Sequence, residues 1–585
     1  MKKIFVFLTL AVMTLAAASC DKMLEEVNYG NPTTKDLLAN EENVALLVGQ
    51  CYAEVKWLHD HWGYWGVVTL TADEGLCPTR VPDKDWEDGG YWKNLNTHNW
   101  NQMGNAFKNI WNTTIQGAVL CNKLLKTLEN SKESMSEDVY NQYVGELETM
   151  RSYYYYMLFD CFGRIPYLEE FVDKADDPLM EPWDVWSHLV NCLEKNAPNL
   201  PPVKDETTRA LNYGRATQGF AYALLARLYL NAESFDCTPE NITLTDEHIT
   251  PITSPADFYT NCVRCCDAII DAHSYSIEPN YFTNFKLDNA ASKENIFVIV
   301  ENGVAEVDER SYDGMMLNKL RIALLTLNYN HQKLYKLKIT PWNGFCARPG
   351  FMDRYNNHDV RGAGYEGQGT KDTKQWGWFL GPIYDATGQM CTDKDKKKSP
   401  AIIIKDIVDE YGEDEPTLSK VSDLSGARSI KYEIDKNGKY TYSENDFVLF
   451  RYADVLWMKE EAILRGGTGT SGWNSADFKA LRARCFAYDN GEASFNAAYP
   501  ALSGDAALTA ASLDAILDER GREFSWENMR RRDLIRFGKF NDETYVQYVT
   551  AKDDYRKWFP IPFSVLEKSV RVDGAPVWTQ NEGYK

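Results

Sequence analysis

The sequence predicts a mainly α-helical protein, built from helical hairpins of the tetratricopeptide kind with long irregular loops and a few short strands. Several stretches repeat apolar residues at every third or fourth position, which is the pattern of amphipathic helices. These stretches are residues 34–58, 105–128, 136–162, 183–193, 218–233, 256–272, 452–465, 475–487 and 512–537. Small residues between large ones, such as Ala221, Ala223 and Ala226, suit close helix crossings. Because no clean period of about 34 residues is present, the prediction is of helical hairpins or degenerate repeats.

Two regions depart from this helical pattern. Residues 59–100 are interrupted by glycine and proline and are predicted to form one long loop. A loop of this length is usually functional or disordered, and its many aromatic residues argue against disorder. Residues 294–300 and 447–450 have the composition of short strands, and residues 435–438 that of a hairpin turn rather than a calcium loop.

The first 20 residues have the pattern of a secretory signal peptide. Two lysines precede an apolar run from residue 4 to residue 18, which is too short to span a membrane. Small residues directly before Cys20 resemble a bacterial lipobox, although Ala17 stands where leucine is usual. We therefore predict a signal peptide at 1–19, lipidation of Cys20 and an acylated tether at 20–33. The alternative, cleavage after Ala18, would release a soluble protein.

The net charge narrows the range of partners. The formal charge of −22 becomes −24 once the signal peptide is removed with its two lysines and no acidic residue. Such a chain repels nucleic acid and anionic lipid heads, so neither is an expected partner. Because no second stretch approaches about 18 consecutive apolar residues, we expect the acyl anchor to be the one membrane attachment.

The chain has 13 cysteines, and lipidation of Cys20 leaves an even number for an exported protein, which leaves disulfide pairing open. Free cysteines inside helical patterns usually pack as small apolar residues. Four are of this kind: Cys51, Cys121, Cys161 and Cys192. Another group, Cys262, Cys265 and Cys266, resembles half of a zinc site, but no second pair with ligand spacing follows. We predict no metal and no cofactor.

Residues 512–537 carry many opposite charges at helical spacing, beside an apolar face that includes Ile516 and Leu517. Charged groups next to a buried face need hydrogen-bonded partners. We therefore interpret this stretch as a structural ion-pair network and not as a catalytic site.

Four stretches together carry a family resemblance. They are the lipobox with acidic residues after it, FRYADVLWMKEEA at 450–462, the ERxREFxxE and RRRDLIRFG patterns within 513–538, and a tail with FPIP at 559–562 and QNEGY at 580–584. The chain resembles the SusD/RagB-like nutrient-binding outer-membrane lipoproteins of Bacteroidetes. Glu582 replaces the proline that the family usually has in its QNPGY ending.

The resemblance implies a single SusD-like domain over residues 34–585, an α-α superhelix without enzyme activity. Its helical scaffold would occupy residues 34–273 and 446–540, with a loop-rich ligand-binding insertion at 274–445. It implies a lipid-anchored protein at the cell surface that binds a glycan, or a peptide in some members. It also implies a SusC-like TonB-dependent transporter as the partner that receives the ligand.

A carbohydrate site needs exposed flat aromatic rings and a few amide, acid or guanidinium groups. Two loop regions offer this mixture, and the resemblance places ligand contacts at about these positions. The predicted contacts are Asp73, Arg80, Trp86, Trp92, Trp100 and Asn101 in the first region, and Trp342, Asn343, Trp376 and Trp378 in the second. Tryptophans at apolar helical spacing are assigned to the core instead: Trp111, Trp183, Trp186 and Trp457, together with Trp57.

Two other function classes fit the sequence less well. A glycoside hydrolase needs two carboxylates facing one another in a cleft, and the sequence offers only the adjacent pairs at 73–74 and 460–461. The triplet at 59–61 (His-Asp-His) fits a polar loop better than a metal site. A helical scaffold that binds only protein is the stronger rival, but it leaves the loop tryptophans unexplained.

Overall fold

The computed structural model describes residues 41–584 except positions 82, 171–176, 247–248, 302–321, 338–339, 363–376, 384–388, 393–400, 408–417, 419, 435–443, 506 and 572–573. The predicted signal peptide, the lipidation site and the tether therefore lie outside the described residues.

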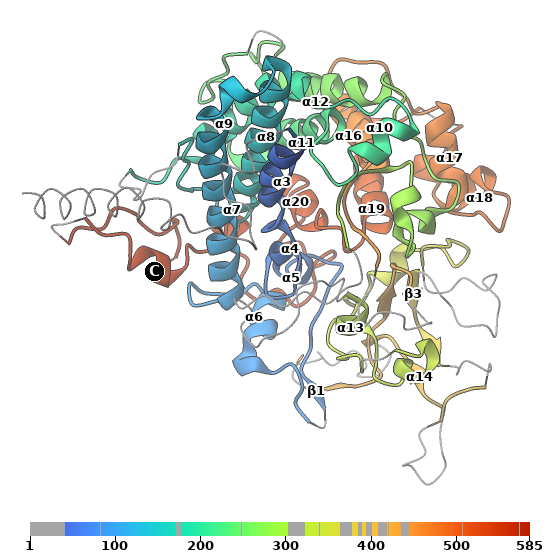
Figure 1. Cartoon of the computed structure of the whole chain (residues 1–585). Helices are drawn as coiled ribbons and strands as arrows, with labels where there is room; N and C mark the ends of the chain where they lie inside the picture. Colours follow the sequence, from blue (N-terminus) through green and yellow to red (C-terminus); the bar gives the residue numbers. More distant parts are fainter. Residues whose placement is uncertain are drawn as a thin grey trace, which may run out of the picture.

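Helical hairpins form the scaffold, as predicted. The long helices are α7 (Asn105–Glu129), α8 (Glu137–Phe162), α9 (Pro182–Asn196), α11 (Gln218–Leu230), α12 (Pro255–Ile270) and α16 (Tyr452–Leu464). Helix α8 packs between α7 and α9, and α12 packs between α11 and α16 (Figure 1). Gly117 permits the close crossing of α7 and α8, because a Cβ there would lie 2.5 Å from the ring of Tyr154.

The N-terminal part differs from the prediction in two ways. The expected helix at 34–58 is described as two helices, α3 (Glu41–Gly49) and α4 (Val55–Leu58), joined by a short 3-10 turn. The expected loop at 59–100 contains two further helices, α5 (Tyr64–Leu70) and α6 (Tyr91–Asn96). Every residue of α5 is buried, so the helix has no polar face. Its sequence therefore lacks the repeat of apolar and polar positions by which an amphipathic helix is predicted.

The strands are short and pair in twos. Strand β2 (Asn295–Ile299) pairs antiparallel with β8 (Phe447–Arg451), which confirms both predicted strands. The other pairs are β1 (Arg80–Val81) with β6 (Val421–Ser422), β3 (Gly377–Phe379) with β7 (Arg428–Ile430), and β4 (Gly381–Pro382) with β5 (Ile403–Ile404). The β1–β6 pair ties the early aromatic region to the loop-rich middle of the chain.

The remaining helices are α10 (Glu206–Leu211), α13 (Ile322–Thr326), α14 (His331–Tyr335), α17 (Ala476–Arg484), α18 (Glu492–Ala498), α19 (Leu513–Glu523), α20 (Arg530–Arg536) and α21 (Phe563–Leu566). The prediction of one helix at 512–537 is wrong, because the chain turns between α19 and α20. Trp526 and Asn528 have φ angles of 62° and 68°, in the left-handed region that ends a helix.

The predicted ion-pair network is confirmed, and it is buried. Five basic side chains (Arg361, Arg451, Arg484, Arg522 and Lys431) contact five acidic ones (Asp359, Glu294, Glu519, Glu523 and Glu527). Glu523 lies at the centre and accepts hydrogen bonds from three of these arginines. Burial alone would raise the pKa of Glu523, but the surrounding arginines hold it well below its usual range. The network joins α19, α17 and the end of β8.

The core assignments hold for most of the tryptophans. Trp111, Trp186 and Trp457 are buried, and Trp183 packs against the core from its edge. Trp57 is only half-buried. The cysteines after Cys20 are free thiols, and all but Cys391 are buried. Within the described part of the chain, we find no helix with the length and apolar composition that crossing a membrane requires.

Candidate functional site

Aromatic side chains from three segments meet near the end of the molecule that carries α6, β1 and α13 (Figure 1). We call this group the aromatic cluster. Its members are His61, Trp62, Trp86, Tyr91, Trp92, Trp342 and Phe345. The segments are far apart in sequence, so the fold and not local structure assembles the cluster.

The cluster has a buried inner layer and a partly exposed outer layer. Trp92 and Phe345 are fully buried at 0% exposure. Trp62 packs on this layer, with its ring centroid 4.6 Å from that of Trp92 and 4.9 Å from that of Tyr91. Trp62, Tyr91, Trp86 and Trp342 are all half-buried. Rings held from behind and open in front can accept a flat apolar ligand without rearranging.

Trp86 is fixed in place by its backbone and by the second segment. Its φ angle of 65° lies in the left-handed region, which residues other than glycine rarely adopt. Its indole Nε1 donates a 2.9 Å hydrogen bond to the backbone oxygen of Trp342. Gly344 makes this approach possible, since a Cβ there would lie 2.3 Å from the Trp86 ring.

Polar side chains border the cluster beside Trp342. Asn343 donates from Nδ2 to Oδ1 of Asp423 at 3.3 Å and accepts from Asn328 at 3.4 Å. The Tyr329 hydroxyl donates to Asp423 Oδ2 at 3.0 Å, and this tyrosine is 44% exposed. Asn343 is buried and positions Asp423, whereas the Asp423 carboxylate and the Tyr329 hydroxyl are groups of the kind that hydrogen-bond sugar hydroxyls.

The rim on the other side is acidic. Asp83, Asp85, Glu87 and Asp88 are exposed on the loop that carries Trp86, and Lys84 is the one basic residue among them. Asp88 also accepts a hydrogen bond from the Trp92 indole at 2.5 Å. The local field therefore repels anionic ligands.

Arg80 was predicted to contact ligand, but the structure places it beneath the loops, at 1% exposure. Its guanidinium donates to the backbone oxygens of Ser422, Ser425 and Gly344 at 2.9, 2.6 and 3.0 Å. Arg80 therefore holds the two cluster-bearing loops together and has no free donor face toward solvent.

Asp73 is also a structural residue in this arrangement. It is buried, and it accepts two 2.7 Å hydrogen bonds from Arg530 and contacts Arg354 at 3.1 Å. Burial would raise the pKa of Asp73, but these arginines lower it below its usual value.

The prediction that Trp92, Trp100 and Trp378 present exposed rings is wrong, because these side chains are 0%, 5% and 2% exposed. Trp100 packs against the C-terminal tail and donates to the hydroxyl of Tyr584 at 2.8 Å. Trp378 packs in the core, where its ring centroid lies 5.3 Å from that of Trp526.

Of the remaining predicted contacts, Asn343 is buried at 4% exposure with both partners described above, and Trp376 lies outside the described residues. Asn101 is exposed, and its Oδ1 caps a turn by accepting from the amide of Met103 at 2.9 Å. Trp86 and Trp342 are the predicted tryptophans that the structure brings together with a partly open face.

Sequence reasoning did not select Trp62, Tyr91, Tyr329 or Asp423. Trp62 and Tyr91 lie in the region already noted for its aromatic content, so that signal could have included them. Tyr329 and Asp423 carry no local signal, because only the packing of two distant loops brings them beside Asn343.

Comparison with known proteins identifies the fold and the family. A model described as the SusD family matches residues 293–584, and a model described as starch-binding, associating with the outer membrane, matches residues 68–230. The chain belongs to the SusD family. Members of this family are non-catalytic binding proteins.

A curated SusD-family relative is the starch-binding protein SusD of Bacteroides thetaiotaomicron. It is 24% identical over 486 residues, which are 75% of this chain and 72% of the relative.

Solved structures share the fold. A SusD superfamily protein from Parabacteroides distasonis has a TM-score of 0.65 at 16% identity, with 93% of this chain and 99% of that chain covered. Surface glycan-binding protein A from Bacteroides thetaiotaomicron in complex with laminarihexaose has a TM-score of 0.60 at 17% identity, with 92% and 99% covered.

The carboxylates of the two candidate catalytic pairs are all engaged in the SusD-like scaffold. Glu461 pairs with Arg536 and Arg465, and Glu460 accepts from the hydroxyl of Ser471. Glu74 accepts from the amide of Trp526 at 2.8 Å. These contacts assign the pairs to packing within the scaffold.

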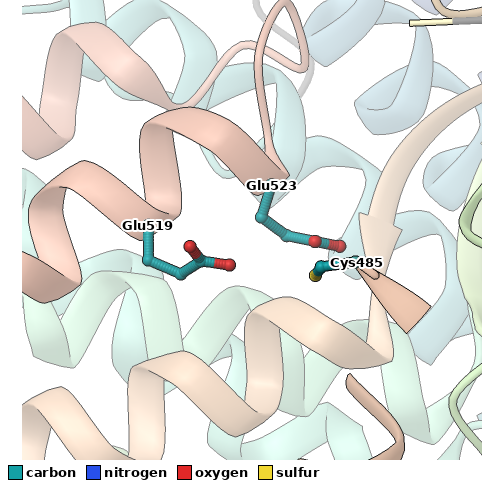
Figure 2. Close-up of side chains that lie close together, drawn as sticks. All are labelled: Cys485, Glu519 and Glu523. Atoms are coloured by element: carbon teal, nitrogen blue, oxygen red, sulfur yellow. The ribbon is translucent and has the colours of Figure 1, made fainter. Parts of the chain in front are cut away.

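One buried group places three potential metal ligands together. Cys485, Glu519 and Glu523 offer ligand atoms within 4.8 Å of one another (Figure 2). Nη1 of Arg361 donates to both glutamates at 2.8 Å. Arg451 and Arg484 also pair with Glu523, and Arg522 pairs with Glu519. These arginines together balance the two carboxylates, so the group belongs to the ion-pair network.

Proposed function

We propose that this chain captures a neutral oligosaccharide or polysaccharide at the cell surface and delivers it to a SusC-like TonB-dependent transporter. The observation that carries the proposal is the outer layer of the aromatic cluster, in which Trp62, Trp86 and Trp342 are half-buried around a polar border. Sugar rings stack their C–H faces on such indoles, and the border supplies acceptors and donors for their hydroxyls.

The charge of the site supports a neutral ligand. The acidic loop beside Trp86 and the carboxylate of Asp423 disfavour an acidic glycan at this position. The printed names of the relatives agree in class, since one is a starch-binding protein and another is bound to laminarihexaose, both neutral glucans.

The N-terminal sequence supports a site of action at the outer membrane. A protein acylated at Cys20 and carried to the outer membrane would hold the aromatic cluster close to a transporter. Growth with radiolabelled palmitate would test this anchor: the wild-type chain should be labelled, and a Cys20→Ser chain should not. Label in both chains would contradict lipidation at Cys20.

Native gels with embedded polysaccharides test the ligand class. The chain from residue 21 onward is run with starch, laminarin or polygalacturonan in the gel, and the same mixtures are assayed for reducing ends. We expect a neutral glycan to retard the protein, with no release of reducing ends. If no glycan retards the protein while peptides from a library bind it in a separate assay, the proposed ligand class is wrong.

A further inference from the structure

A hollow lies between α7 and the C-terminal segment. Figure 1 shows these two parts of the chain beside one another. The volume of the hollow is about 340 Å³, within the usual range of about 300–1,000 Å³ for small-molecule sites. We call it the α7 groove. It is lined by Lys108, Trp111, Asn112, Ile115, Gln116, Ser564, Val565, Lys568, Ser569, Val570, Val577 and Trp578. It shares no lining residue with the aromatic cluster.

Hydrogen bonds to the main chain hold the C-terminal wall of the groove. The indole of Trp578 donates to the backbone oxygen of Asp177 at 2.9 Å, and its amide donates to Oγ of Ser569 at 3.1 Å. The amide of Phe563 donates to the backbone oxygen of Gln102 at 3.0 Å, which fixes α21 against the start of α7. The groove is therefore preformed, and binding there costs little ordering of the chain.

The floor of the groove is aromatic and aliphatic. The ring of Trp111 is buried, and its centroid lies 5.9 Å from that of Trp578. Trp578 is half-buried and so keeps part of its ring open. Ile115 and Val577 add aliphatic surface beside it. This floor suits the apolar face of a ring-shaped ligand.

The polar groups of the groove are basic or neutral, and none is acidic. Lys108 and Lys568 are exposed, and within the described chain neither ammonium group forms an ion pair. Asn112, Gln116, Ser564 and Ser569 offer neutral donors and acceptors. In a chain of net charge −22, two ammonium groups without a nearby carboxylate in the lining make this hollow complementary to an anion.

We propose that the α7 groove binds an acidic saccharide unit, a sugar ring that carries a carboxylate or a sulfate. The sugar face packs on Trp578, the amide and hydroxyl side chains bind its hydroxyls, and Lys108 and Lys568 bind the anionic group. The charge preference is opposite to that of the aromatic cluster, so the protein holds two sites for two classes of sugar. The inference does not depend on the ligand of the aromatic cluster.

Calorimetric titrations of the chain from residue 21 onward test the proposal with three probes: digalacturonic acid, a disaccharide of chondroitin sulfate, and lactose as the neutral control. We expect at least one acidic disaccharide to bind, and its affinity to fall as salt is raised. Lactose should not bind the Trp342→Ala chain, in which the aromatic cluster is removed as a neutral sugar site. Lys108→Gln and Lys568→Gln should each weaken binding by about tenfold, the loss typical of one charged hydrogen bond.

Matched variants distinguish binding in the α7 groove from binding elsewhere on the protein. Lys123→Gln, also exposed on α7 but outside the groove, should leave the affinity unchanged. Trp342→Ala should leave it unchanged too, even if it abolishes neutral glycan binding at the aromatic cluster. The proposal is overturned if lactose binds Trp342→Ala as well as the acids do, if neither acid binds the wild type, or if Trp342→Ala removes the binding of the acids.

Discussion

The buried ion-pair network around Glu523 predicts a large loss of stability when this residue becomes glutamine. Glu523 is fully buried and accepts hydrogen bonds from Arg361, Arg451 and Arg484. With five basic and five acidic members, the network is electrically balanced. Glu523→Gln leaves one positive charge without a counter-charge in the protein interior.

The size of the effect follows from this imbalance. Removing one partner from a buried ion pair costs about 3–5 kcal/mol, because the remaining charge stays desolvated. Unfolding entropy of about 2.1 cal/mol/K per residue gives roughly 1.2 kcal/mol/K for a chain of this size. We therefore expect the Tm to fall by about 2.5–4 °C if the protein unfolds in one transition.

Differential scanning calorimetry at neutral pH measures this change. Glu240→Gln is the matched control, since Glu240 is exposed and its loss should move the Tm by less than about 1 °C. A Tm for Glu523→Gln equal to that of the control would refute the reasoning. It would mean that the positive charge left without a partner costs the folded state no stability.

Two further predictions concern the site and the pH dependence. Gly344→Ala places a Cβ about 1 Å inside contact distance of the Trp86 ring, so it should displace this indole and weaken neutral glycan binding several-fold in calorimetry while leaving the Tm nearly unchanged; an unchanged affinity would contradict the role of Trp86. Burial raises the pKa of Glu74 from 4.5 to about 8. Because the folded state then holds the proton more tightly than the unfolded state, stability from this group is full below about 4.5 and is lost as the pH rises toward 8. As the pH rises from about 5 to 8, the Tm of Glu74→Gln should fall less than the Tm of the wild type. An identical pH dependence of the two Tm values would show that Glu74 does not carry this effect.

The sequence predicted α7 and α9 because each buries one stripe and exposes another. The apolar spacing from 105 to 128 matches α7 (Asn105–Glu129), and Ser136 was the expected start of the segment that α8 (Glu137–Phe162) occupies. It failed at α5 (Tyr64–Leu70), which is buried on all sides and contains glycine. It also failed at the break between α19 and α20, where left-handed residues other than glycine turn the chain.

The site was predictable in part. Aromatic density placed Trp86 and Trp342 in the right loops, but density alone does not distinguish a ring that faces the ligand from one that supports it. Trp92 lies six residues from Trp86 and is fully buried behind it. The polar neighbours at Asp423 and Tyr329 depend on contacts between loops about 80–95 residues apart, which no local pattern encodes.

The most direct test of the central claim compares Trp342→Ala with Trp100→Phe in a calorimetric titration of the neutral glycan that the native gels select. If a sugar covers roughly 60 Å² of the Trp342 ring, at about 25 cal/mol/Å² its loss costs about 1.5 kcal/mol, or roughly tenfold in affinity. Trp100 is buried against the C-terminal tail, so Trp100→Phe should leave the affinity within about twofold of the wild type. Full affinity in Trp342→Ala, with loss of binding in a folded Trp100→Phe, would contradict the aromatic cluster as the glycan site.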